Sequence, residues 1–336
     1  MHLSRIPAGM RYYVGDEARL RRRVEDTAMG VFDRWSYEEI TTPSVDYYAL
    51  FEHGMGATEA QRSFRFTDQD GRLLTLRPDV TSSVARAAAT LLSDRPRPLR
   101  LCYAAPVFQQ QSHSAAEWRR ENTQLGCELI GAGDASADVE VLLVAAEILQ
   151  QLGLQDSCCI TLNHVGIFNG LAEQFSLDAN AREEVRQLID SRAIPELNRY
   201  SNDVLRCNSF ADLVHLKGKQ EVIQPAQELA SNARSGEALA ALAELWQALE
   251  TKGLTGLFEI DLGDVSSLDY YTGLSFKVFI SGAGSRVGGG GRYDGLIGNF
   301  GMSEPAIGFV LNLDGLTEVI SRRNQPQRTQ MHTDLN

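Results

Sequence analysis

Two extended segments, residues 100–109 and 122–131, constrain the fold of this chain more than any other feature of its sequence. A polar stretch rich in Gln, Ser, Glu and Arg separates them, so the pair predicts a long antiparallel hairpin. The chain lacks the regular strand–helix alternation of a doubly wound sheet. We therefore expect an α+β fold with a mostly antiparallel sheet flanked by helices. Further strands are predicted at residues 158–164, 257–263, 274–282 and 306–313.

Helical periodicity appears in two long segments, residues 16–36 and 134–152. In the first, apolar residues recur at spacings of three and four, which predicts one buried face: Val24, Ala28, Val31, Phe32 and Trp35. A strand at residues 72–80 is expected to run into a helix that Thr81 or Ser82 caps. Residues 165–253 are rich in Ala, Leu, Glu and Arg, which predicts a helical insertion.

Composition excludes several classes of protein. A formal charge of −12 disfavours nucleic-acid binding, which draws on clustered Lys and Arg. The five cysteines and six histidines show no spacing typical of metal ligands, so we expect no metal and no cofactor. The first residues lack the apolar run of a signal peptide and no stretch is long enough to span a membrane, so a cytoplasmic protein is expected.

The segment TQLGCELIG, residues 123–131, carries the first candidate site. Side chains alternate along a strand, so Gln124, Gly126 and Glu128 share one face, while Leu125, Cys127 and Leu129 share the other. Gln124 and Glu128 lie roughly 13 Å apart along the strand, with Gly126 leaving an open floor between them. The polar face predicts a slot for a small polar molecule, although a plain solvent-facing strand fits the same pattern.

Two further segments carry candidate site residues. In LRPDVT, residues 76–81, Asp79 and Thr81 have the groups to hold an ammonium ion, or alternatively to cap the following helix. The glycine run 288–291 lacks the Lys-Ser/Thr ending of a phosphate loop. Its composition indicates a backbone that closely approaches a ligand or a neighbouring strand, with a flexible turn as the alternative.

Five motifs, taken in order, resemble the catalytic core of class II aminoacyl-tRNA synthetases and, within it, the histidyl-tRNA synthetase branch. The resemblance covers about residues 5–320. The motifs are LRPDVT, TQLGCELIG, SSLDYYTG at 266–273, GGGGRYDGL at 288–296 and PAIGFVLNLDGL at 305–316. The resemblance implies a core domain over residues 1–323 that includes the insertion at 165–253. We expect a polar tail at 324–336 and no anticodon-binding domain, which argues against tRNA as a partner.

The resemblance also assigns site residues. It implies that histidine is bound by Asp79, Thr81, Gln124, Glu128, Tyr270 and Tyr271, with Gly126, Gly289 and Gly290 in the pocket wall. Three arginines that serve adenylate formation in the synthetases are replaced here by Gln109, Ser266 and Gly315. Each lost electrostatic stabiliser typically costs about 10²- to 10³-fold in rate, so no catalytic residue is expected.

A histidine pocket without adenylation chemistry resembles the regulatory subunits of ATP phosphoribosyltransferase, the first enzyme of histidine biosynthesis. The resemblance to these regulatory subunits implies that the chain has no activity of its own and joins a short-form catalytic partner in a hetero-octamer. It further implies allosteric feedback inhibition by L-histidine. It also implies a homodimer formed through about residues 10–52. Two alternatives stay open: a truncated synthetase-like adenylating enzyme, and a stand-alone amino-acid sensor.

Overall fold

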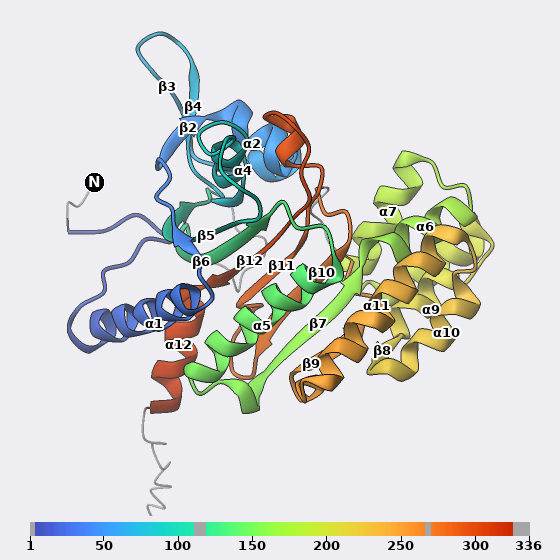
Figure 1. The fold of residues 1–336 in the computed structure, drawn as a ribbon. Coiled ribbons are helices and arrows are strands. Elements are labelled where there is room, and N and C mark those ends of the chain that lie inside the picture. The colour runs from blue at the N-terminus through green and yellow to red at the C-terminus, as the bar shows by residue number, and fades with distance from the viewer. Residues whose placement is uncertain (1–3, 111–118, 266–269, 325–336) are drawn as a thin grey trace, which may run out of the picture.

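The fold is described here from a computed structural model covering residues 4–110, 119–265 and 270–324. Its centre is a nine-stranded sheet, antiparallel except where β1 pairs with β5 and where β7 pairs with β9 (Figure 1). This confirms the predicted α+β class. The strands, in spatial order, are β1 (Glu38–Glu39), β5 (Leu99–Phe108), β6 (Glu121–Ile130), β12 (Ala306–Asn312), β11 (Gly288–Arg292), β10 (Leu274–Ile280), β7 (Cys158–His164), β9 (Phe258–Asp261) and β8 (Lys217–Gly218).

The predicted hairpin is confirmed. Strands β5 and β6 pair over their full length, from Leu99 opposite Ile130 to Phe108 opposite Glu121. A second, three-stranded sheet lies beside this part of the molecule (Figure 1). Its strands, in spatial order, are β2 (Val45–Tyr47), β4 (Leu73–Leu76) and β3 (Arg65–Thr67).

Helices cover the two faces of the large sheet differently. The larger core cluster joins one face to α1 (Gly15–Arg34), α5 (Ala135–Gln151) and α11 (Ala233–Thr251). As predicted, Val24, Ala28, Val31 and Phe32 of α1 are buried, whereas Trp35 lies just beyond the helix. A smaller cluster joins the other face to α4 (Thr81–Ala89), near α2 (Tyr48–Met55) and α3 (Ala57–Ala60). Helix α12 (Leu313–Asn324) follows β12 and packs against α1.

The segment 165–253 is helical, as the composition predicts, and gathers beside the β7–β9 end of the sheet (Figure 1). It also supplies the edge strand β8, which two residues are too few to predict from periodicity. The helices are α6 (Val165–Gln174), α7 (Ala179–Asp190), α8 (Ile194–Tyr200), α9 (Ser209–His215), α10 (Ile223–Leu229) and α11.

The glycine run forms the strand β11, between β10 and β12. A Cβ at Gly290 would lie well inside van der Waals contact of the Gly308 carbonyl, and one at Gly289 would lie 2.8 Å from the Phe276 carbonyl. The predicted close approach of a neighbouring strand is therefore confirmed. The alternative of a flexible turn is wrong, because these glycines pair along the ladder on both sides.

Candidate functional site

We call the cavity that gathers the predicted site residues the main cavity; its volume is about 430 Å³, and residues of the large sheet, α3, α4 and α12 line it. This size lies within the range of small-molecule sites in proteins. Its walls bring together eight of the predicted site residues: Asp79, Thr81, Gln124, Glu128, Tyr270, Tyr271, Gly289 and Gly290. Gln109 and Gly315 also line it, whereas Ser266 lies outside the described residues.

Glu128 forms the polar centre of the cavity, and its side chain is almost fully buried. Its carboxylate accepts hydrogen bonds from Thr81 Oγ1 at 2.8 Å, from the Tyr103 hydroxyl at 3.0 Å and from the Tyr293 hydroxyl. Within residues 4–110, 119–265 and 270–324 no Lys, Arg or His forms an ion pair with it. Burial raises the pKa of Glu128 to about 7, although the hydroxyl donors oppose that shift. Its charge is thus left for a ligand to neutralise.

Two glycines decide what surrounds this carboxylate. Gly308 lies opposite Glu128 in the ladder, and a Cβ there would collide with the Glu128 side chain. A Cβ at Gly126 would lie 2.6 Å from the Tyr103 ring. The expected open floor at Gly126 is therefore wrong, because Tyr103 from the paired strand fills that space. Gly126 makes room for a hydrogen-bond donor to Glu128 and does not line the cavity.

Asp79 caps the helix that follows it, which was the alternative role that the sequence allowed. Its Oδ2 accepts hydrogen bonds from the Ser82 backbone N–H at 2.9 Å and the Ser82 hydroxyl at 3.0 Å. Asp79 thus satisfies the first turn of α4, and the prediction that Thr81 or Ser82 caps this helix is wrong, because the Thr81 hydroxyl is turned to Glu128. Burial raises the pKa of Asp79, which also lines the cavity.

The remaining wall residues offer aromatic surface and an amide. The Tyr270 and Tyr271 rings meet edge to face with centroids 4.9 Å apart, and Tyr293 lies 6.0 Å from Tyr270. Gln124 Oε1 is buried and has no hydrogen-bond partner in the described part of the chain. A ligand with an N–H donor near Gln124 would satisfy that oxygen, which is the usual state of a buried polar atom.

The chain is similar to known proteins over most of its length. The histidyl-tRNA synthetase family model matches residues 9–316. An ATP phosphoribosyltransferase regulatory subunit of Moorella thermoacetica is 36% identical over 315 residues, which are 93% of this chain and 80% of that protein. One of Halothermothrix orenii is 33% identical, over 92% of this chain and 74% of that protein.

The chain belongs to the family of ATP phosphoribosyltransferase regulatory subunits, which share the histidyl-tRNA synthetase fold.

Solved structures agree with this assignment. An ATP phosphoribosyltransferase regulatory subunit/histidyl-tRNA synthetase from Bacillus halodurans matches with a TM-score of 0.87 and 30% identity, over 95% of this chain and 84% of that one. A histidine–tRNA ligase subunit from Alicyclobacillus acidocaldarius matches with a TM-score of 0.83 and 25% identity, over 97% and 99%. The predicted class II synthetase-like core is therefore confirmed.

Cationic side chains line the outer end of the cavity, although the sequence motifs indicate a loss of arginines. The motif resemblance predicts that Gln109 and Gly315 replace arginines of the synthetases, but four other cations line the wall: Arg119, Lys277, Arg286 and Arg322. Three of them are paired with carboxylates of the chain. Arg119 reaches Glu318 at 3.0 Å, Lys277 pairs with Asp264, and Arg322 pairs with Glu318. The cavity is thus not free of cations, but most of their charge is balanced internally.

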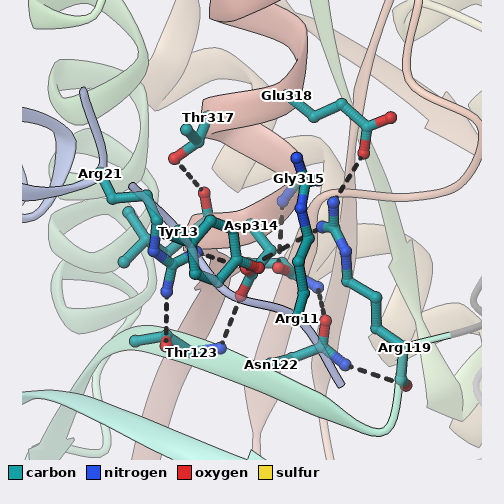
Figure 2. Close-up of polar contacts among 12 residues, drawn as sticks. Arg11, Tyr13, Arg21, Arg119, Asn122, Thr123, Asp314, Gly315, Thr317 and Glu318 are labelled. Atoms are coloured by element: carbon teal, nitrogen blue, oxygen red, sulfur yellow. Dashed lines mark hydrogen bonds and ion pairs between the residues drawn. The ribbon is translucent and has the colours of Figure 1, made fainter. Parts of the chain in front are cut away.

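Beside this outer end, Asp314 holds together three distant segments (Figure 2). Its buried carboxylate accepts hydrogen bonds from the Tyr13 hydroxyl, the Arg21 guanidinium and the Thr123 backbone N–H, the last at 2.9 Å. Arg119 lies 4.0 Å from it. The N-terminal arm, α1, β6 and the start of α12 are therefore fixed to one another at the residue next to Gly315.

Sequence reasoning missed several residues of the site. Tyr103 and Tyr293 donate to Glu128, and Asp314 joins the segments around Gly315. The available signals were Tyr103 across from Gly126 in the predicted hairpin and Tyr293 inside the GGGGRYDGL motif. No pattern in the sequence links Asp314 to Tyr13 or Arg21.

The described residues show neither a metal site nor a membrane span. They hold no cluster of three His, Cys, Asp or Glu side chains suited to a metal ion. No helix within 4–110, 119–265 or 270–324 combines the length and apolarity needed to cross a membrane.

Proposed function

We propose that this chain is the non-catalytic regulatory subunit of an ATP phosphoribosyltransferase and that it binds L-histidine in the main cavity. Family membership supports the first part. The observation that carries the second is the buried Glu128 carboxylate, to which only hydroxyl groups donate within the described part of the chain. A buried carboxylate without a counterion favours a ligand that brings N–H donors or positive charge, and histidine brings both.

Calorimetry with L-histidine tests the site directly. Wild-type protein and Glu128→Ala are titrated under the same conditions, with Glu147→Ala as the control, because this half-buried carboxylate of α5 pairs with Arg34 and does not line the cavity. A hydrogen bond to a charged group contributes about 1.5–3 kcal/mol, so Glu128→Ala is expected to weaken binding at least about tenfold. Equal affinity of wild type and Glu128→Ala would show that histidine does not use this carboxylate.

We further propose that histidine bound here changes the activity of a short-form catalytic partner within a hetero-octamer. A coupling of about 1–3 kcal/mol is ordinary for two linked sites and corresponds to roughly 5- to 150-fold. The test assays phosphoribosyl transfer by a short-form catalytic subunit with and without this chain, across a histidine titration. An unchanged rate together with unchanged histidine sensitivity would rule out the regulatory role.

The homodimer is proposed from the surface of the three-stranded sheet. Tyr47, Leu74 and Phe66 lie side by side across it, next to Val45 opposite Leu76. Val45, Tyr47 and Phe66 are each more than 40% exposed. Together these side chains form a contiguous apolar patch that a partner surface would cover. A second copy of this chain is the expected partner, because the resemblance places dimer contacts at about residues 10–52.

Sedimentation of the isolated chain tests the dimer. Tyr47→Asp together with Phe66→Asp is expected to convert a dimer to a monomer. Leu91→Asp, a control at a side chain that is 80% exposed and belongs to none of the three strands, should stay dimeric. A wild-type monomer at micromolar concentration would contradict the proposal.

An adenylating enzyme is the second candidate, because four cationic side chains line the cavity wall. Three of them are ion-paired, and preorganised charge for a phosphate must be available to it. Histidine-dependent exchange of pyrophosphate into ATP is therefore expected to be absent. Measurable exchange would favour this candidate over the regulatory subunit.

A further inference from the structure

A cavity that binds histidine, as proposed above, must also recognise the carboxylate of the amino acid. Glu128, Tyr103, Tyr293 and Thr81 supply carboxylate and hydroxyl groups. The Glu128 carboxylate suits the nitrogens of an amino acid, and the three hydroxyl groups already donate to Glu128, so none of these groups is left to stabilise the ligand's own carboxylate. The same cavity must therefore offer a cation elsewhere if it binds a free amino acid in its ionised form.

Three of the four wall cations are already engaged. Arg119 has Glu318 at 3.0 Å and Asp314 at 4.0 Å, and Arg322 shares Glu318. Lys277 lies between Asp264 and Asp190, with Asp190 at 3.8 Å. Binding a ligand carboxylate through any of these would compete with an existing ion pair.

Arg286 differs from these three. It lines the cavity, its side chain is exposed, and it forms no ion pair or hydrogen bond with another side chain of the described part of the chain. It lies close enough to Tyr271 to oppose the rise that burial causes in the pKa of the tyrosine hydroxyl. An arginine is always charged, and its planar guanidinium matches a carboxylate with two parallel hydrogen bonds.

The position of Arg286 along the sheet fits one amino acid. Glu128 lies in register with Gly308, which lies in register with Gly291, and Tyr271 packs against Gly291. Arg286 precedes Gly291 by five residues, which is roughly 17 Å at about 3.3 Å per residue. Gly291 also lies two strands from Glu128, so both side chains must extend towards a small amino acid that lies between them.

We propose that Arg286 binds the carboxylate of the amino acid whose nitrogens Glu128 and its neighbours hold. The loop before β11 then determines that the ligand is an amino acid and not an amine or alcohol of the same shape. This assigns two ends to the cavity: a carboxylate end at Glu128, and a guanidinium end at Arg286.

Two ligands that differ only at the carboxylate test the proposal. L-histidinol keeps the imidazole and the amino group of L-histidine but carries an alcohol in place of the carboxylate. Calorimetry on the wild-type chain is expected to show histidine binding about 10- to 100-fold tighter than histidinol. Arg286→Gln should lose most of that preference by weakening histidine alone, and Arg286→Lys should fall between. Arg322→Gln, which alters an ion-paired cation on the same wall, should leave the preference unchanged.

These titrations distinguish an error in the role of Arg286 from an error in the proposed histidine site. If wild type binds histidine and Arg286→Gln binds it equally well, the carboxylate does not use Arg286. If Arg286→Gln weakens histidine and histidinol by the same factor, the arginine acts on the shape of the cavity and the inference is overturned. Wild-type protein that binds neither ligand would overturn the proposed histidine site and this inference with it.

Discussion

Glu128 and Asp314 are both buried carboxylates near one cavity, but the protein satisfies them in different ways. Among the residues that the structure describes, only hydroxyl groups donate hydrogen bonds to Glu128 and no cation pairs with it. Asp314 accepts from the Arg21 guanidinium as well as from a tyrosine and a backbone N–H. A carboxylate with an internal counterion is a structural link, whereas one without it is available to a ligand. The comparison predicts that the two residues affect different measurements.

The largest expected effect is on stability, at Asp314. Asp314→Ala leaves the largely buried Arg21 guanidinium without its partner and removes the acceptor for Tyr13 and Thr123. Removing one partner of a buried ion pair typically costs about 3–5 kcal/mol, so the free energy of unfolding in urea should fall by that amount.

Glu25→Ala serves as the control for Asp314→Ala. It breaks the ion pair between Arg22 and Glu25, in which the arginine is 70% exposed, and exposed pairs of this kind contribute little. If Asp314→Ala lowers the free energy of unfolding no more than Glu25→Ala does, the ion pair of Asp314 does not stabilise the fold. The proposed difference between Asp314 and Glu128 would then be wrong.

The next effect is a pH dependence that belongs to Glu128. Burial raises its pKa to about 7 in the folded chain, from an ordinary value near 4.5. Between these pH values the folded chain holds a proton that the unfolded chain has released. The free energy of unfolding should therefore decrease as pH rises through this window. One pKa unit corresponds to about 1.4 kcal/mol, so the full decrease is about 3 kcal/mol.

Glu128→Gln isolates this contribution, because the amide cannot titrate. Urea unfolding of wild type and variant at several pH values between about 4.5 and 7 should give curves that diverge by about 3 kcal/mol. Wild type should lose stability relative to the variant as the pH rises. Parallel curves would show that Glu128 stays ionised in the fold, and the contrast with Asp314 would then lose its basis.

The two sites also differ in how far the sequence could predict them. Strand alternation was enough to place Gln124 and Glu128 on one face of β6 and Leu125, Cys127 and Leu129 on the buried other face. The solvent-facing alternative for Glu128 is wrong, because α4 and three hydroxyl donors cover it. The hydrogen bond from Tyr103 to Glu128 was not predicted, because the Tyr103 ring occupies space that Gly126 leaves on the neighbouring strand.

Asp314 could not be predicted from local pattern. Its partner Arg21 is 293 positions away, and in sequence both residues are ordinary members of helices. The same holds for the carboxylates that pair with Arg119, Lys277 and Arg322. The motif resemblance predicts which arginines of the synthetases are replaced, but the sequence does not show which of the remaining cations are paired. Periodicity and the order of the motifs predict the fold. Which charges of distant segments pair with one another can be seen only in the three-dimensional structure.

The smallest expected effect is at Gly315, the neighbour of Asp314 in α12. A Cβ there would meet Val287 Cγ1 at 3.4 Å, an ordinary contact, and would leave the backbone N–H bonded to Asn312 Oδ1. Alanine within a helix is more stable than glycine by roughly 0.5–1 kcal/mol, so Gly315→Ala should slightly raise the free energy of unfolding. Its histidine affinity should match wild type, because the carboxylate of Asp314 and the charge at the cavity wall are unchanged. A loss of stability approaching that of Asp314→Ala would show that backbone shape, and not the ion pair, holds the N-terminal arm to α12.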